Sequence, residues 1–139
     1  MPKFNQRLYD ENDKRAKDAL RKYLDSLGIY TFIQEDYKAD IKGFREEHYE
    51  AEIKNTWKED WPVSWRTIHI PARKKKYMDD GKTVIFWIFN YNCSQAWRIH
   101  GDHLTEDHIE NIPNKRYPEG EPFYNIPTRL GKLVEIIKK

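Results

Sequence analysis

The chain has 139 residues and a formal net charge of +2, so no strong overall electrostatic field identifies its partner. A single cysteine, Cys93, excludes an intrachain disulfide framework and a zinc site built on cysteines. An aromatic content of 14% argues against disorder, and we expect one folded domain that spans residues 1–139.

Residues 10–27 are the first predicted element, an amphipathic helix. Its apolar side chains recur at helical spacing between lysine, arginine and aspartate residues, and they are Ala16, Ala19, Leu20, Tyr23, Leu24 and Leu27. Asp10 or Asn12 is the expected N-cap, and Gly28 stands where the helix should end. The β-branched and aromatic residues at 29–33 then predict a first strand.

An acidic hairpin over residues 37–54 is the most informative stretch of the sequence. Side chains of a strand alternate between its two faces, so Glu50, Glu52 and Lys54 share one face. The residues between them, which can be buried on the other face, are Tyr49, Ala51 and Ile53. Glu50 is expected at the solvated rim of the charged face, although it could also serve a second metal ion.

The preceding strand brings a second carboxylate to the same face. A hairpin symmetric about Glu46 would set Asp40 opposite Glu52, with Cβ atoms about 4.5–5.5 Å apart. Two carboxylates at that distance repel each other unless a cation or a proton lies between them. With Lys54 beside them, these residues predict a site that holds a divalent cation against a phosphodiester and activates water.

The rest of the chain is predicted as a series of shorter elements. Residues 56–68 are irregular because Pro62 interrupts any helix, whereas Pro71 suits a helical first turn. The elements expected are a helix at 70–78, a central strand at 83–90, a strand at 95–100 that pairs with it as a hairpin, a short helix at 104–112, a loop at 113–122, an extended segment at 123–126, and a helix or strand at 130–137. The expected fold class is α/β, with a central mixed sheet flanked by α-helices.

The hairpin and the order of elements around it resemble the PD-(D/E)XK nuclease superfamily. Residues 52–54, Glu-Ile-Lys, match its Glu-x-Lys motif, and Asp40 is the acid of the preceding strand, with Ala39 where a proline is usual. The resemblance covers roughly residues 10–100 as an order of elements. That order is helix, strand, acidic strand, Glu-x-Lys strand, helix, strand, strand. It implies a restriction-endonuclease-like core.

The resemblance also implies an activity and its residues. Asp40, Glu52 and the Ile53 carbonyl would bind Mg²⁺ or Mn²⁺, and Lys54 would assist the attacking water in hydrolysis of a DNA phosphodiester bond. Glu11 is the candidate for the helix-borne glutamate that many members place near the metal. Similarity to Holliday-junction resolvases and small phage-type endonucleases implies branched DNA as substrate and a homodimer.

The basic run of residues 73–76 is the predicted DNA-binding element. Arginine and lysine side chains on the exposed side of a helix can contact phosphates. Four consecutive positions of an α-helix span about 300°, so they cannot all reach one ligand. We expect Arg73 and Tyr77, one turn apart, to face the site together, with Lys74 and Lys75 near the DNA backbone.

The aromatic and histidine residues near this run have two readings. Trp57, Trp61 and Trp65 recur every four residues and suit either base stacking or packing, and packing is favoured because tryptophan is usually at least partly buried. His69 can touch a phosphate, but an ordinary polar loop residue is the favoured reading.

Three other functions remain open from the sequence. They are a catalytically inactive nucleic-acid-binding domain on the same fold, a nuclease directed at RNA, and a protein-interaction module. DNA is preferred to RNA as the partner. No segment resembles a signal peptide or a membrane span, so we expect a soluble, cytoplasmic protein without a membrane partner.

Overall fold

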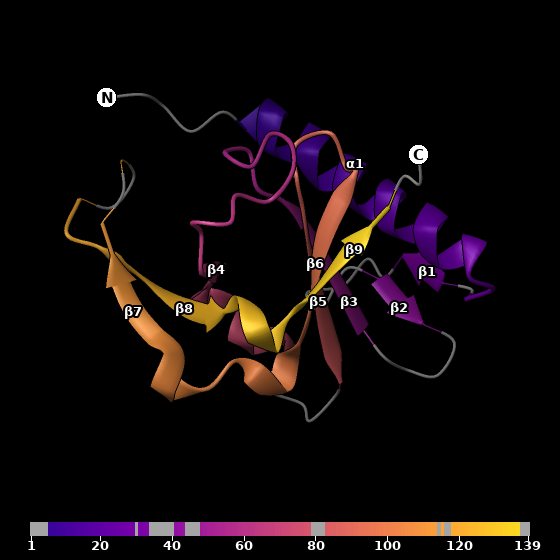
Figure 1. Ribbon diagram of the computed structural model, residues 1–139. Coiled ribbons are helices and arrows are strands. Elements are labelled where there is room, and N and C mark those ends of the chain that lie inside the picture. The colour runs from indigo at the N-terminus through magenta and orange to yellow at the C-terminus, as the bar shows by residue number, and fades with distance from the viewer. Residues whose placement is uncertain are drawn as a thin grey trace.

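The protein is an α/β domain built from two β-sheets and one long α-helix (Figure 1). The computed structural model describes residues 6–29, 31–33, 41–43, 48–78, 83–113, 115 and 118–136. Within those ranges no helix is both long enough and apolar enough to cross a membrane.

The larger sheet has six strands in the order β1-β2-β3-β5-β6-β9. Their bounds are β1 Thr31–Ile33, β2 Ile41–Gly43, β3 His48–Ile53, β5 Val84–Phe89, β6 Gln95–His100 and β9 Lys132–Glu135. Strands β3 and β5 are parallel, whereas the other neighbours are antiparallel, so the prediction of a mixed sheet is confirmed.

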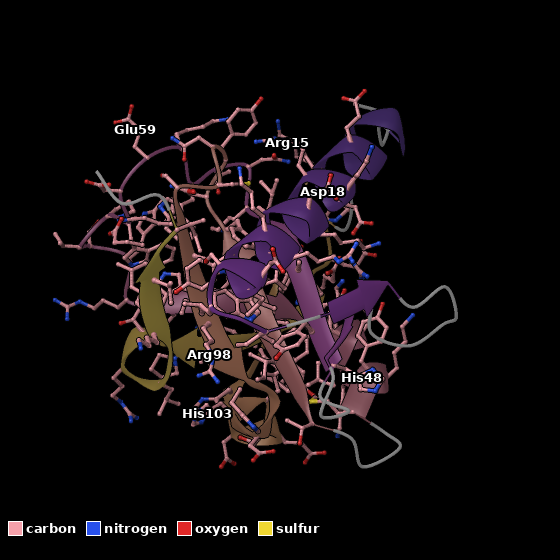
Figure 2. The ribbon with its side chains drawn as sticks, turned by 90° about the vertical axis from the view of Figure 1, so that its right-hand side faces the viewer. Arg15, Asp18, His48, Glu59, Arg98 and His103 are labelled. Carbon is pink, nitrogen blue, oxygen red and sulfur yellow. The ribbon has the colours of Figure 1, made fainter. Side chains whose placement is uncertain are left out.

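Helix α1, Gln6–Ser26, lies across one face of this sheet (Figure 2). Its apolar stripe of Ala16, Leu20 and Leu24 is fully buried against strands β3 and β5. The helix begins before residue 10, so Asp10 and Asn12 lie inside it and the prediction that one of them is the N-cap was wrong.

Gly28 ends α1 as predicted. Its φ of 79° is left-handed, a conformation that costs other residues steric strain. The Gly28 amide donates to the Asp25 carbonyl at 2.9 Å, and the Ile29 amide donates to the Leu24 carbonyl at 2.9 Å. This pair of bonds is the Schellman motif, which satisfies carbonyls that the helix leaves without partners.

The smaller sheet covers the opposite face of the larger one. It has three antiparallel strands in the order β4-β8-β7, which are Thr67–Pro71, Glu121–Pro127 and Ile109–Ile112. Ile68 and Ile70 of β4 pack with Tyr124 and Ile126 of β8 in a core that also contains β5 and β6 side chains. A sheet therefore stands where the sequence predicted flanking α-helices, and that part of the fold-class prediction is corrected.

Strand β5 lies between the two cores, as its apolar sequence predicted. All six of its residues are buried. Ile85, Trp87 and Phe89 pack under α1, whereas the alternate residues Val84, Phe86 and Ile88 pack under the smaller sheet. Its hairpin with β6 through residues 90–94 is also confirmed.

Short 3₁₀ helices and strands replace three predicted helical segments. The 3₁₀ helices are η1 Ala72–Met78, η2 Gly101–His103, η3 Glu106–His108 and η4 Thr128–Leu130. Pro71 ends β4 and does not start a helix, so the predicted helix at 70–78 is shortened to η1. The predicted helix at 104–112 was wrong because Ile109–Ile112 pairs with β8. The alternatives left open at 130–137 resolve in favour of a strand, β9.

The substitution Gly28→Ala tests the helix end. We expect the free energy of unfolding to fall by about 1 kcal/mol, because alanine is strained at this φ while its Cβ meets no neighbouring atom. Urea denaturation measures the change. The neighbouring exposed residue supplies a control, Leu27→Ala, whose effect should stay within about 0.5 kcal/mol. Equal effects of the two substitutions would contradict the role given to Gly28.

Candidate functional site

Strand β3 divides its side chains between the two faces of the larger sheet, as predicted. The residues packed under α1 are Tyr49, Ala51 and Ile53. Glu50 and Glu52 lie in register with Phe86 and Ile88 of β5, which face the smaller sheet. Lys54 follows β3 directly, and its amide continues the ladder by donating to the Phe89 carbonyl at 2.8 Å.

The pairing of β2 with β3 differs from the predicted register. Ile41 lies opposite Tyr49, whereas a hairpin symmetric about Glu46 would place it opposite Ala51. Turn geometry fixes the register of a hairpin, and the sequence did not define the turn. A shift of two residues leaves the predicted division of the β3 side chains between the two faces unchanged, because faces alternate with a period of two. Asp40 itself lies outside the described residues.

Glu50 is buried and paired, so its predicted place at a solvated rim was wrong. The Glu50 side chain is 2% exposed, and its Oε1 accepts a hydrogen bond from the Lys74 ammonium at 2.5 Å. Burial by itself lowers the pKa of Lys74, but the carboxylates of Glu50 and Glu52 outweigh it and hold that pKa above the ordinary lysine value. Glu50 therefore has a structural counterion.

The geometry of η1 explains why Lys74 points inward. A 3₁₀ helix has three residues per turn, so Lys74 and Tyr77 lie on the same side of η1. In an α-helix, Arg73 and Tyr77 would have shared a side instead. The Lys74 Nζ lies 5.6 Å from the centre of the Tyr77 ring. Arg73, Lys75 and Lys76 are exposed. Of the predicted DNA-binding lysines, the structure places Lys75 at the surface and Lys74 inside.

Glu52 and Lys54 occupy a different environment from Glu50. Both are half-buried, and among the described residues no hydrogen bond or ion pair is made by either charged group. They open together on a pocket of about 190 Å³, named here the Glu52 pocket. Its other lining residues are His69, Pro71, Ile88, Ile112 and Phe123. Burial lowers the pKa of Lys54, and the nearby Glu52 carboxylate opposes that shift.

His69 reaches this pocket from β4, where it pairs in register with Asn125 of β8. It therefore lies on a strand, and the favoured reading as a loop residue was wrong. Burial lowers the pKa of His69 and the Lys54 ammonium adds to the effect, while Glu110 and Asn125 oppose it. The sequence signal for this position was the alternation of apolar and polar residues over Thr67–Pro71, which is only five residues long and ends in a proline.

The early turns of α1 approach the end of β3. Asn12 is buried, and its Nδ2 donates to Oδ1 of Asn55 at 2.8 Å, one residue after Lys54. Glu11 is exposed on α1 next to Asn12. A role for Glu11 near a metal ion stays a prediction.

The three tryptophans pack against one another, as favoured from the sequence. Trp57 is 1% exposed, and the rings of Trp61 and Trp65 are half-buried. Trp57 and Trp61 are edge to face with centroids 5.0 Å apart, and Trp61 and Trp65 repeat the arrangement at 5.2 Å. Lys54 Nζ lies 5.8 Å from the Trp65 ring centre, so Trp65 combines a packing role with a position beside the site.

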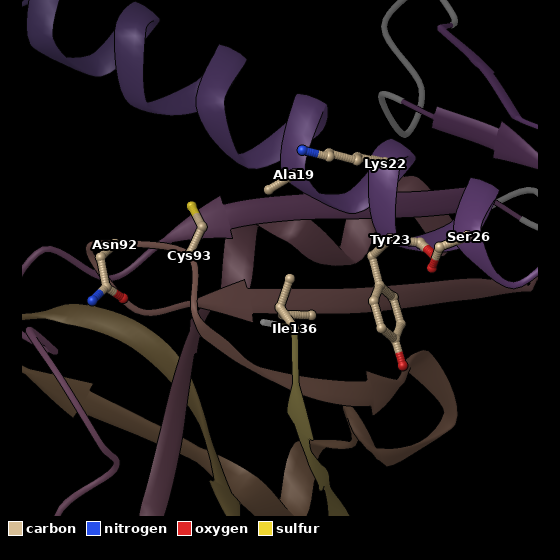
Figure 3. Close-up of a pocket in the computed structure, with 7 residues that line it drawn as sticks. All are labelled: Ala19, Lys22, Tyr23, Ser26, Asn92, Cys93 and Ile136. Carbon is tan, nitrogen blue, oxygen red and sulfur yellow. The ribbon is translucent and has the colours of Figure 1, made fainter. Parts of the chain in front are cut away.

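A separate cavity of about 300 Å³ lies between α1 and the turn that joins β5 to β6 (Figure 3). Ala19, Lys22 and Tyr23 line it from the helix, and Cys93 lines it from the turn. Its lining contains no carboxylate. This cavity therefore lacks the oxygen ligands of the predicted metal site.

The donor set at β3 fits one part of a magnesium site. A half-buried carboxylate that faces a pocket, and that makes no direct ion pair with a described residue, is the hard oxygen ligand that Mg²⁺ or Mn²⁺ takes. Within the described ranges, no three His, Cys, Asp or Glu side chains gather closely enough to hold a metal ion. No protein-family model, curated protein or solved structure matches the chain.

The substitution Lys74→Met tests the buried ion pair. It removes the Lys74 ammonium from the buried Glu50 carboxylate, so we expect a loss of about 3–5 kcal/mol in the free energy of unfolding by urea. The folded-state pKa of Lys74 is raised, so its contribution is fully present below the ordinary lysine pKa of about 10.4. The contribution is lost only as the pH rises above that value.

Two variants serve as controls for this pair. The first control is Lys75→Met at the exposed neighbouring residue, which should change the free energy of unfolding by less than about 0.5 kcal/mol. The double variant Glu50→Leu with Lys74→Met removes both charges and should recover most of the loss. A loss in Lys74→Met no greater than in Lys75→Met would show that the pair does not stabilise the fold.

Proposed function

We propose that the chain is a divalent-metal-dependent nuclease that hydrolyses phosphodiester bonds in DNA. The observation that carries the proposal is that Glu52 and Lys54, both half-buried, lie together at the end of β3 and open on one shared pocket. Partial burial of each charged group costs stability, and the attraction between Glu52 and Lys54 offsets part of that cost. A metal ion beside a phosphate supplies both a cation for Glu52 and an anion for Lys54.

The chain's own residues hold and orient the reactants. Glu52, Asp40 and the Ile53 carbonyl would bind Mg²⁺ or Mn²⁺, and the bound ion would polarise the phosphate and favour ionisation of water. The Lys54 ammonium offsets negative charge that develops on the phosphate oxygens. Ile88 contributes an apolar part of the pocket wall.

The order of elements supports the same proposal. Helix α1, then β1, β2, β3, η1, β5 and β6 follow the succession on which the nuclease resemblance rests, with two differences: strand β4 lies between β3 and η1, and η1 is a 3₁₀ helix in place of an α-helix. We propose a restriction-endonuclease-like core on this basis. Selection of branched DNA and action as a homodimer belong to the proposal through the resemblance alone.

The path of β4 supports a DNA-binding role for η1. Pro71 lines the Glu52 pocket, and Arg73 follows two residues later on the surface. Arg73 and Lys75 can therefore contact phosphates of a strand that enters the pocket. Lys74 is assigned to Glu50 instead, because its ammonium is already bound there.

Glu52→Gln and Lys54→Met test the activity. Each should lower Mg²⁺-dependent nicking of supercoiled DNA by about 10²-fold or more, because each removes a charge that acts on the reacting phosphate. Glu59→Gln is the matched control for the acid, since Glu59 is exposed in the loop that follows β3 (Figure 2). Lys58→Met is the control for the lysine, and both controls should nick DNA like the parent.

Calorimetric titration with Mn²⁺ checks the metal site separately from cleavage. The parent should take up the ion, and Glu52→Gln should bind it more weakly. Parallel digestion of duplex DNA, branched DNA and single-stranded RNA identifies the substrate. Absence of metal uptake, together with equal nicking by parent and Glu52→Gln, would overturn the proposal. Failure to bind any polynucleotide at low salt would favour a protein-interaction module.

A further inference from the structure

A second pocket adjoins the Glu52 pocket and shares Lys54 and His69 with it. It has a volume of about 320 Å³, within the range of small-ligand sites. Its remaining lining comes from the loop between β3 and β4 and from the start of β4. We name it the Arg66 pocket after its exposed arginine.

The lining of the Arg66 pocket suits a phosphate group. It carries the cations Lys54 and Arg66 and no carboxylate, whereas Glu52 lines only the neighbouring pocket. Among the described residues, no acidic side chain pairs with the Arg66 guanidinium. Hydroxyl donors complete the wall, and they belong to Thr56, Ser64 and Thr67. Guanidinium, ammonium and hydroxyl groups are the usual donors to phosphate oxygens.

Trp65 adds an aromatic surface to the same pocket. Its ring is braced edge to face by Trp61, whose Nε1 donates to the Trp65 carbonyl at 2.9 Å. The Trp61 amide in turn donates to Gln95 Oε1 of β6 at 3.1 Å, which ties the loop to the larger sheet. The ring is therefore held in place before a ligand arrives, and an aromatic ring so held can stack with a nucleic-acid base.

Cation and ring lie within the reach of a single nucleotide. Lys54 Nζ lies over the Trp65 ring, 5.8 Å from its centre, and Arg66 is the residue that follows Trp65 in the chain. We propose that the Arg66 pocket binds one unpaired nucleotide of the DNA strand, with its phosphate at Lys54 and Arg66 and its base against Trp65. This inference rests on the proposed function, because it places that nucleotide next to the phosphodiester that Glu52 and Lys54 cleave.

The inference restricts the class of substrate. A base can enter a pocket only after it leaves the helical stack, and this costs least where the strand is already single. The protein therefore binds single-stranded DNA, or a duplex next to a single-stranded segment, in preference to continuous duplex. The site contacts the phosphate charge and the aromatic ring of the nucleotide, which all four nucleotides share, so we expect it to bind all four bases.

Binding of a fluorescent oligothymidine strand, measured by anisotropy without divalent metal, tests the pocket apart from cleavage. Arg66→Glu should weaken binding by about tenfold, and the milder Arg66→Gln should lower the salt-dependence slope by about 0.7. Arg98 supplies the matched controls Arg98→Glu and Arg98→Gln, because it is exposed on β6 outside the pocket (Figure 2). Both control variants should bind with the parent's affinity and salt slope.

A fully abasic strand of equal length tests the contact with Trp65. It should bind the parent about tenfold more weakly, the cost of one lost stack. Equal affinity for the abasic and thymidine strands overturns the base contact, and equal affinity for duplex overturns the preference for unpaired DNA. Circular dichroism confirms that each variant is folded.

The outcomes separate this inference from the proposed nuclease. If both Arg66 variants bind with the affinity and salt slope of the parent, the proposed nucleotide-binding pocket is refuted. This holds even if the parent cleaves DNA in a manner that depends on Glu52. Loss of single-strand binding in both Arg66 variants, but not in the Arg98 variants, supports the pocket even where no DNA is cleaved. That second result would leave a single-strand-binding protein without the hydrolytic activity.

Discussion

The alternation of side chains along β3 is the constraint on which the candidate site depends. One face of the strand is committed to the core under α1 through Tyr49, Ala51 and Ile53. The charged residues at the intervening positions must therefore face the smaller sheet. Their environments then differ with position along the strand. Glu50 is enclosed and neutralised by Lys74, whereas Glu52 and Lys54, nearer the end, face pockets.

The smaller sheet converts that charged face into a bounded site. Its strands β4, β7 and β8 all follow β3 in the chain and are separated from it by the loop that begins at Lys54. Ile68 and Ile70 anchor β4 in the core, and burial of each such side chain contributes about 1.5–3 kcal/mol. The alternate residue His69 thereby faces the pocket that Lys54 also lines. Apolar packing beneath β4 thus positions the polar groups above it.

The sequence predicted the structure correctly where a periodic pattern of apolar residues continued over a whole element, or where a segment was uniformly apolar. The stripe of α1, the alternation of β3 and the buried hairpin of β5 and β6 were all predictable for this reason. Strands β4 and β7 were missed because their few residues include proline, histidine, glutamate and asparagine, and only pairing with β8 makes them strands.

The candidate site was predictable in its composition but not in its partners. The sequence alternation places Glu50, Glu52 and Lys54 on one face, but it does not show which carboxylate forms the ion pair with Lys74. That choice depends on η1 being a 3₁₀ helix, which turns Lys74 inward. The Arg66 pocket was not visible either, because it forms where the loop before β4 folds back beside the end of β3.

Lys54 lines both pockets, and one ammonium cannot serve two neighbours independently. An anion bound in the Arg66 pocket would offset the positive charge of Lys54 as it is felt at Glu52, and would so leave that carboxylate more attractive to a cation. Thermodynamic linkage makes the effect reciprocal, so a cation bound at Glu52 strengthens anion binding at Arg66 by the same factor. A single shared side chain is thus enough to make the two occupancies cooperative, without any change in the backbone.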